Sequence, residues 1–171
     1  MSGITQPCRL TIFGFGNPGR GDDALGLALL RRFASQQETQ NVLRGCRLIE
    51  AIQLQIEHAL DLIDQELALV VDAAVAGRAP YAFRRLQAQR DVTYTSHAMS
   101  PEALLQVYET ICGRSAPPAY QLMILGERFD LEAPLSERAE RHLDAAYEFL
   151  AHLCAVPEPG LWAQHADEDT A

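Results

Sequence analysis

Apolar residues along this chain form two alternating patterns, which are short continuous runs and stripes with a helical spacing. Short apolar runs are typical of buried strands, whereas apolar residues separated by alternating steps of three and four are typical of helices. The runs cover residues 10–13, 47–50, 67–72, 81–86 and 121–126. The stripes cover residues 24–33, 56–63, 100–112 and 136–153. The alternation predicts strands connected by helices.

Two of these segments carry further information about their surroundings. The helical stripe at 56–63 predicts one buried face, formed by Ile56, Ala59, Leu60 and Ile63. Arg84 and Arg85 interrupt the run at 81–86, so we expect that strand nearer an edge of the sheet.

The order of elements predicts the fold class. Strands that alternate with helices favour a mostly parallel, twisted sheet with helices on both faces. We therefore expect a single-domain α/β fold, a three-layer sandwich around a five-stranded sheet. Residues 1–154 would form this domain, and we expect the acidic, proline-bearing segment 155–171 to be a flexible tail.

Composition narrows the class of protein. The chain of 171 residues has a net charge of −9, which argues against a nucleic-acid partner because such surfaces are basic. It shows no signal-peptide pattern and no apolar run long enough to span a membrane, so we expect a cytoplasmic protein. Its four scattered cysteines form no C-x-x-C pair and are expected to be reduced.

The stretch of residues 14–26, GFGNPGRGDDALG, lies between the first apolar run and the first helical stripe. Ligands of open α/β sheets bind where strands end, and glycines allow the backbone to turn tightly there. One aspartate would suffice to cap the helix, so two adjacent ones indicate a ligand-binding or catalytic role. We expect Asp22 to be a cap or turn residue and expect the loop to meet a substrate through Gly14, Gly16, Asn17 and Asp22.

The same stretch matches the G-x-G-x-x-G pattern of dinucleotide-binding proteins, a weak signal when it stands alone. The expected acidic residue about 20 positions later is represented only by Glu38 in a polar segment. Two aspartates would also repel a pyrophosphate. We therefore do not expect a dinucleotide cofactor.

Three residues are expected to meet at the carboxyl edge of the sheet: Asp23 after the first strand, Asp72 at the end of the third, and His97 before the helix at 100–112. Two carboxylates and an imidazole form a mixed ligand set, and imidazole suits nickel, zinc or iron. Each residue also has an ordinary interpretation, because Asp23 could cap a helix, Asp72 could form a turn and His97 could lie in a surface loop. Glu50 ends the second strand and is a further candidate acid at this edge.

Together, the Gly14-x-Gly16-Asn17 motif with Asp22-Asp23, the Val70-Val71-Asp72-Ala73 segment and Ser96-His97 resemble the hydrogenase maturation endopeptidases over residues 10–153. The resemblance implies that Asp23, Asp72 and His97 contact nickel. Two departures stand out. Some members carry glutamate in place of Asp23, and Glu50-Ala51-Ile52-Gln53 replaces an acid followed by Gly-Gly-Thr.

What the resemblance implies is removal of a C-terminal extension from the nickel-loaded precursor of the hydrogenase large subunit. Nickel would arrive with that precursor, and the free enzyme, expected to be a monomer, would hold no metal tightly. Asp23 or Asp72 would activate water, with Glu50 as a further catalytic acid, by either metal-assisted or aspartic-type chemistry. The alternative is a non-catalytic module that senses nickel with the same residues.

Overall fold

Five strands form one sheet in the computed structural model, which describes residues 9–36, 45–90 and 99–170. The strands are β1 (Leu10–Phe15), β2 (Cys46–Ala51), β3 (Leu67–Ala74), β4 (Tyr81–Leu86) and β5 (Ala119–Leu125). Their order across the sheet is β2-β1-β3-β5-β4, with β4 antiparallel to β5 and all other neighbours parallel. This arrangement confirms the mostly parallel sheet and the edge position of the arginine-bearing strand.

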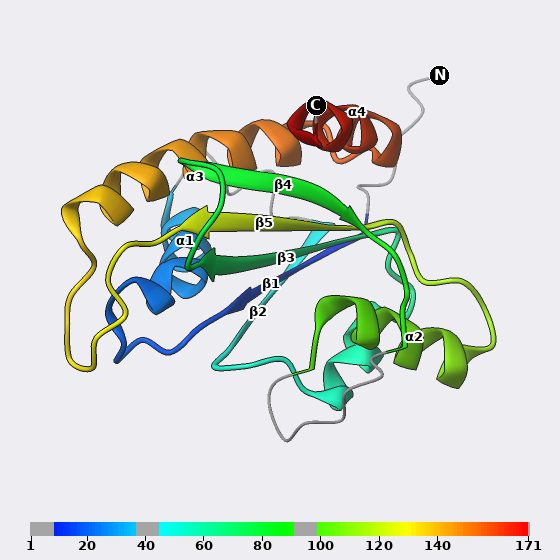
Figure 1. The fold of residues 1–171 in the computed structure, drawn as a ribbon. Coiled ribbons are helices and arrows are strands. Elements are labelled where there is room, and N and C mark those ends of the chain that lie inside the picture. The colour runs from blue at the N-terminus through cyan, green and yellow to red at the C-terminus, as the bar shows by residue number, and fades with distance from the viewer. Residues whose placement is uncertain (1–8, 37–44, 91–98, 171) are drawn as a thin grey trace.

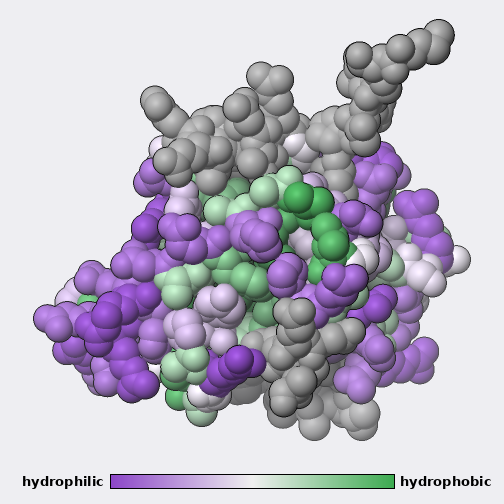
Figure 2. All heavy atoms as spheres, turned by 90° about the horizontal axis from the view of Figure 1, so that it is seen from above, coloured by the Kyte–Doolittle hydropathy of each residue, from purple (hydrophilic) through white to green (hydrophobic). Residues whose placement is uncertain are grey.

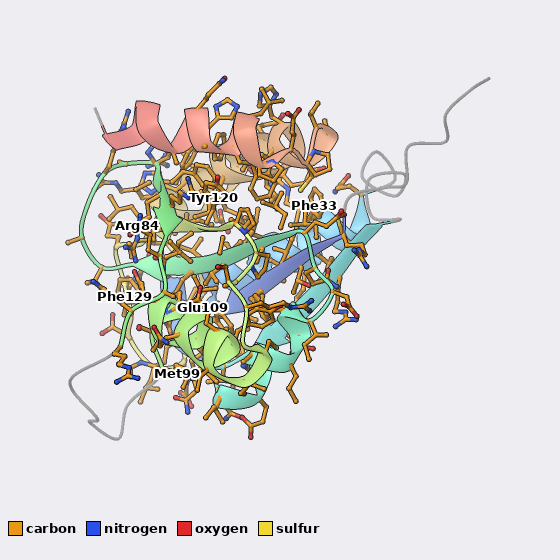
Figure 3. All side chains as sticks on the ribbon, turned by 90° about the vertical axis from the view of Figure 1, so that its right-hand side faces the viewer. Phe33, Arg84, Met99, Glu109, Tyr120 and Phe129 are labelled. Atoms are coloured by element: carbon orange, nitrogen blue, oxygen red, sulfur yellow. The ribbon has the colours of Figure 1, made fainter. Side chains whose placement is uncertain are left out.

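Helices cover both faces of this sheet (Figure 1). One layer holds α1 (Leu25–Ser35), α3 (Glu137–Ala155) and α4 (Pro159–Thr170), and the other holds the 3₁₀ helix η4 (Ile56–Leu62) and α2 (Pro101–Cys112). Each layer has its own apolar core against the sheet. Figure 3 shows Phe33 and Tyr120 on the side of the sheet that α3 and α4 cover, and Met99 on the side of α2. The structure thus confirms a three-layer α/β sandwich.

The alternation of side chains along β3 determines which face of the sheet carries the carboxylate of Asp72. Successive side chains of a strand point to opposite faces. Leu69 and Val71 belong to the core beneath α1 and α3, whereas Val70 belongs to the core beneath α2 and η4. Asp72, two residues after Val70, therefore faces the α2 and η4 side.

Within the segment 56–63, Ile56–Leu62 form a 3₁₀ helix, and its buried face differs from the prediction. Ala59 and Leu62 are buried, whereas Ile56 and Leu60 are each 55% exposed. A 3₁₀ helix has three residues per turn, so side chains at positions i and i+3 share a face. The predicted spacing assumed an α-helix, and the change of pitch moves the buried face to Ala59 and Leu62.

The expectation of a flexible C-terminal tail is also wrong, because residues 159–170 form the helix α4. Trp162 is fully buried and its indole N–H donates to the Leu153 carbonyl at 3.0 Å. Its ring packs edge-on against Tyr120 and Phe83, with centroid distances of 5.6 and 6.2 Å. Trp162 thus packs α4 into the core, together with the buried Ala166, although most residues of this segment are polar or small.

Candidate functional site

A cleft of about 320 Å³ opens at the carboxyl ends of β1, β2 and β3. The chain leaves β1 for β2 on one side and later returns to β3 on the other, so the cleft lies at a topological switch point of the sheet. Open α/β sheets bind ligands at such points. The lining residues are Phe15, Gly16, Asn17, Arg20, Asp23, Ile52, Gln53, Leu54, Val70, Asp72, Met99 and Pro101.

Asp72 reaches the cleft from β3 and is largely enclosed. Burial raises the pKa of its carboxyl to about 6, while the N–H of Ala73, which donates at 2.8 Å, opposes this shift and the negative charge of Asp23 adds to it. A carboxyl group with a pKa near 6 can exchange a proton at neutral pH. Asp72 therefore has the properties of a general acid or base.

Asp23 enters the same cleft from η1 (Gly21–Ala24), a 3₁₀ turn directly before α1. Its carboxylate accepts a hydrogen bond of 2.9 Å from the N–H of Asn17. Asn17 in turn accepts one at 2.9 Å from the N–H of Gly19. The glycine-rich loop is thus folded around the Asp23 side chain and fixes its position.

Gly16 is required for this arrangement. Its φ of +139° is rarely adopted by L-residues, and a Cβ there would lie 1.8 Å from the Asp23 carbonyl oxygen. Gly26 plays a similar part in α1, because a Cβ there would lie 2.4 Å from the carbonyl oxygen of Phe15 and 2.6 Å from that of Val71. Both glycines let η1 and α1 approach β1 and β3 closely enough to bring Asp23 beside the sheet.

Asp23 and Asp72 are therefore the two acids that the structure brings into one cleft among the described residues. Their charges interact, since Asp23 contributes to the raised pKa of Asp72. Either a shared proton or a bound cation would relieve this repulsion. The pair can consequently serve acid–base chemistry or contribute oxygen ligands to a metal.

Asp22 points away from the cleft and is fully buried. Its carboxylate accepts four hydrogen bonds, from the N–H groups of Glu127, Arg128 and Ser136 and from the Ser136 hydroxyl. Burial alone would raise its pKa, but these donors outweigh that effect and lower it. The prediction that Asp22 contacts a substrate is therefore wrong, because its side chain instead binds the segment before α3.

Glu50 also departs from its predicted place. Its carboxylate forms an ion pair of 2.9 Å with Arg31 on α1, and it is not among the residues that line the cleft. It lies opposite Gly14 in the β1–β2 register, where its side chain reaches the α1 layer. We therefore leave Glu50 out of the candidate catalytic set.

His97 lies outside the described residues, so its predicted role stays a prediction. Met99 and Pro101, which follow it closely in the sequence, line the cleft. Within ranges 9–36, 45–90 and 99–170, no group of three or more histidine, cysteine, aspartate or glutamate side chains is arranged to hold a metal ion. Of the three predicted metal ligands, only Asp23 and Asp72 lie within the residues that the structure describes.

The sequence-based prediction missed Arg20, Ile52 and Gln53, which also line the cleft. Arg20 is exposed, and its Nε donates to the Phe129 carbonyl at 3.4 Å. A charged residue between two glycines of the first motif was a usable signal for Arg20. Ile52 and Gln53 follow β2 and had no such signal, because their segment departs from the glycine-bearing motif.

No family model matches this chain, and no curated protein does. Solved structures do. The hydrogenase maturation protease HycI from Thermococcus kodakarensis KOD1 superposes with a TM-score of 0.67 at 17% identity, covering 88% of this chain and 95% of that one. The hydrogenase maturating endopeptidase HybD from Escherichia coli gives 0.63 at 17%, covering 85% and 91%.

A further match is HybD from Thermococcus kodakarensis, a [NiFe] hydrogenase maturation protease, with a TM-score of 0.61 at 18% identity. It covers 85% of this chain and 99% of that one. The chain therefore has the fold of these proteases over nearly all of their length. In the parts of the chain that the structure describes, no helix is both long and apolar enough to cross a membrane.

Proposed function

We propose that this chain is a cytoplasmic endopeptidase that removes the C-terminal extension from the nickel-loaded precursor of a [NiFe] hydrogenase large subunit. The observation that carries the proposal is the placement of Asp23 and Asp72 in one cleft at the switch point of the sheet. Support comes from the fold, which is that of hydrogenase maturation proteases. The glycine motif that positions Asp23 is the same motif on which the sequence resemblance rests.

The two aspartates suit hydrolysis of a peptide bond. Asp72, with its pKa of about 6, would accept a proton from the attacking water and return it to the leaving amine. The side chain of Asp23 accepts the N–H of Asn17, and the negative charge of Asp23 favours the protonated form of Asp72 after the first transfer. The proton taken from water thus ends on the new amino terminus.

The remaining wall of the cleft suits an extended peptide. Arg20, Asn17 and Gln53 carry side-chain N–H groups that can donate to peptide carbonyls. Ile52, which is 66% exposed, offers apolar surface beside them. A substrate segment that covers Ile52 would bury this surface and gain affinity.

Nickel enters this proposal as cargo of the precursor. Hard carboxylate oxygens and an imidazole bind such an ion modestly, and they add to ligands that the precursor already supplies. The described residues fit this role through Asp23 and Asp72, whose mutual repulsion a cation relieves. On its sequence position, His97 is the proposed third ligand. Cleavage would then depend on prior loading of the precursor.

The test is incubation of the full chain with the precursor in nickel-loaded and nickel-free forms, followed by intact-mass measurement. We expect the loaded precursor to lose its C-terminal extension and the nickel-free precursor to keep it. A loaded precursor that binds the chain yet keeps its full mass would contradict the peptidase and favour a non-catalytic nickel-sensing module. Equal cleavage of both forms would contradict the proposed dependence on nickel but would leave the peptidase activity supported.

A further inference from the structure

Exposed apolar side chains gather in one short segment that begins in the wall of the cleft. Among the described residues, nine large apolar side chains are exposed, and four of them lie between positions 52 and 63. These four, Ile52, Ile56, Leu60 and Ile63, are named here the η4 apolar surface. The other five are spread over positions 75–161. Apolar side chains that are exposed together, unlike single ones, indicate a binding surface.

The fold of this segment leaves aliphatic side chains in solvent. Its apolar spacing is typical of a helix with one buried stripe, yet only Ala59 and Leu62 of η4 reach the core. The N–H of Ile63 donates to the Leu60 carbonyl at 3.2 Å, so the 3₁₀ turn continues to Ile63. Leu60 and Ile63 are three residues apart and therefore share a face, which is the exposed one.

The η4 apolar surface is held firmly from beneath. His58 fixes the start of η4, because its Nδ1 accepts from the N–H of Gln55 at 2.9 Å. The His58 ring lies edge-on to Phe13 and Phe15, with centroid distances of 5.9 and 5.8 Å. On its other side η4 packs against α2. A surface that is already in place loses little conformational entropy when a partner binds.

Ile52 joins the η4 apolar surface to the cleft, whose wall it forms together with Gln53 and Leu54. From there the chain runs from the end of β2 to η4 beside α2 (Figure 1). In the proposed function, an extension that lies in the cleft is still covalently attached to the body of the precursor. That body must therefore rest against surface at the mouth of the cleft, and the η4 apolar surface begins there.

The opposite layer is a poorer place for such a partner. Figure 2, which looks onto the layer of α3 and α4, shows a largely hydrophilic face with apolar residues near its centre. Among the described residues, none that lines the cleft comes from α3 or α4. A precursor body docked on that layer would lie across the sheet from Asp72, which faces the α2 and η4 side.

We propose that the η4 apolar surface is the docking site for the folded body of the large-subunit precursor, which presents an apolar patch to Ile56, Leu60 and Ile63. This inference rests on the proposed function and adds a contact outside the reacting residues. Burial of the aliphatic side chains supplies affinity. The precursor is then held by its body as well as by its extension, so a peptide with the sequence of the extension alone should bind more weakly.

The experiment compares binding and cleavage of the nickel-loaded precursor by variants of the full chain. Ile56→Ser/Leu60→Ser alters two side chains that are each 55% exposed, and Val156→Ser, 51% exposed at the end of α3, is the matched control. Isothermal titration calorimetry gives Kd for the precursor and for the extension peptide in an Asp72→Asn background, in which cleavage is predicted to be slow. Intact-mass measurement gives kcat and KM without that substitution.

We expect the double variant to raise Kd and KM for the precursor at least tenfold. Its kcat, its melting temperature and its affinity for the extension peptide should be unchanged, because the substituted side chains are exposed and lie outside the cleft. Val156→Ser should change Kd and KM less than twofold.

Unchanged Kd and KM in the double variant would overturn the proposal, as would an equal loss in Val156→Ser or an equal loss of peptide binding. A dimer of the unmodified chain that dissociates in the double variant, with precursor affinity unchanged, would assign the surface to a second copy and also overturn it. A precursor that binds through the surface yet keeps its extension would contradict only the peptidase function. Rapid cleavage with unchanged Kd would contradict only the docking site.

Discussion

The carboxylate of Asp22 accepts two hydrogen bonds from Ser136, one from its N–H and one from its hydroxyl, both at 2.7 Å. The Ser136 hydroxyl oxygen also accepts from the N–H of Ala139 at 3.1 Å and so caps the start of α3. The residue next to the proposed catalytic Asp23 is thereby tied to a segment more than a hundred positions later. Asp22 therefore stabilises the loop, whereas Asp23 faces the cleft.

Replacing Asp22 by asparagine should destabilise the fold. An amide has one acceptor oxygen, whereas four donors face this buried carboxylate, so at least one donor loses its partner. We expect Asp22→Asn to lower the free energy of unfolding by roughly 2–4 kcal/mol in urea denaturation. Asp130→Asn, at an exposed position of the same segment, is the control and should stay within about 0.5 kcal/mol of the unmodified chain. Equal stability of the two variants would contradict this role of Asp22.

Asp72 predicts an unusual dependence of stability on pH. Its pKa is about 6 in the folded chain against an ordinary value of 3.8, so the folded state binds the proton more tightly. Stability contributed by this group therefore falls as pH rises from about 4 to 6, by on the order of 3 kcal/mol. Asp72→Asn removes the ionisable group and should be more stable than the unmodified chain at pH 7–8 but not at pH 4. Parallel unfolding curves across this range, with a constant difference between the two proteins, would contradict the raised pKa.

Replacing Gly16 in the glycine-rich loop should cost more stability than replacing Gly77, which lies between β3 and β4 and has a similar backbone angle. Gly16 and Gly77 have φ of +139° and +129°, but a Cβ would meet the Asp23 carbonyl oxygen only at Gly16, whereas nothing lies within 4 Å at Gly77. Gly77→Ala should cost only the backbone strain of about 1–3 kcal/mol. Gly16→Ala should cost more and should displace Asp23, which thermal unfolding and precursor cleavage can measure together. Unimpaired cleavage in Gly16→Ala would show that the loop does not position Asp23.

Replacing Trp162 should show how much the packing of α4 contributes to the stability of the domain. Truncation of a fully buried tryptophan to alanine typically costs about 3–5 kcal/mol. We expect this loss in Trp162→Ala by scanning calorimetry, and we expect Gln164→Ala, at an exposed position of the same helix, to change stability little. If Trp162→Ala melts like the unmodified chain, α4 contributes no stability to the domain.

Several features could be predicted from the sequence because they depend on local pattern. The apolar run before Asp72 predicts a strand buried on both faces, and alternation along that strand then directs the aspartate to one of them. The glycine motif places Asp23 after a strand, where the structure has it. Arg84 and Arg85 correctly indicate an edge strand.

Other features depend on contacts between distant segments. The Asp22 carboxylate is bound by Ser136, and α4 packs on the sheet through Trp162, which lies against Tyr120 and Phe83. Alternation along β2 puts Glu50 on the α1 side with Leu48, but its ion pair with Arg31 depends on how α1 packs there. No local spacing predicts which distant residues make these contacts.

The central claim is that the carboxylates of Asp23 and Asp72 together cleave a peptide bond. The most direct measurement is the rate at which the nickel-loaded precursor loses its extension, followed by mass spectrometry, with Asp23→Asn, Asp72→Asn and the control Glu50→Gln. We predict that each aspartate variant slows cleavage by about a hundredfold or more and that Glu50→Gln cleaves at the unmodified rate. Cleavage at the unmodified rate by folded Asp72→Asn would contradict the account.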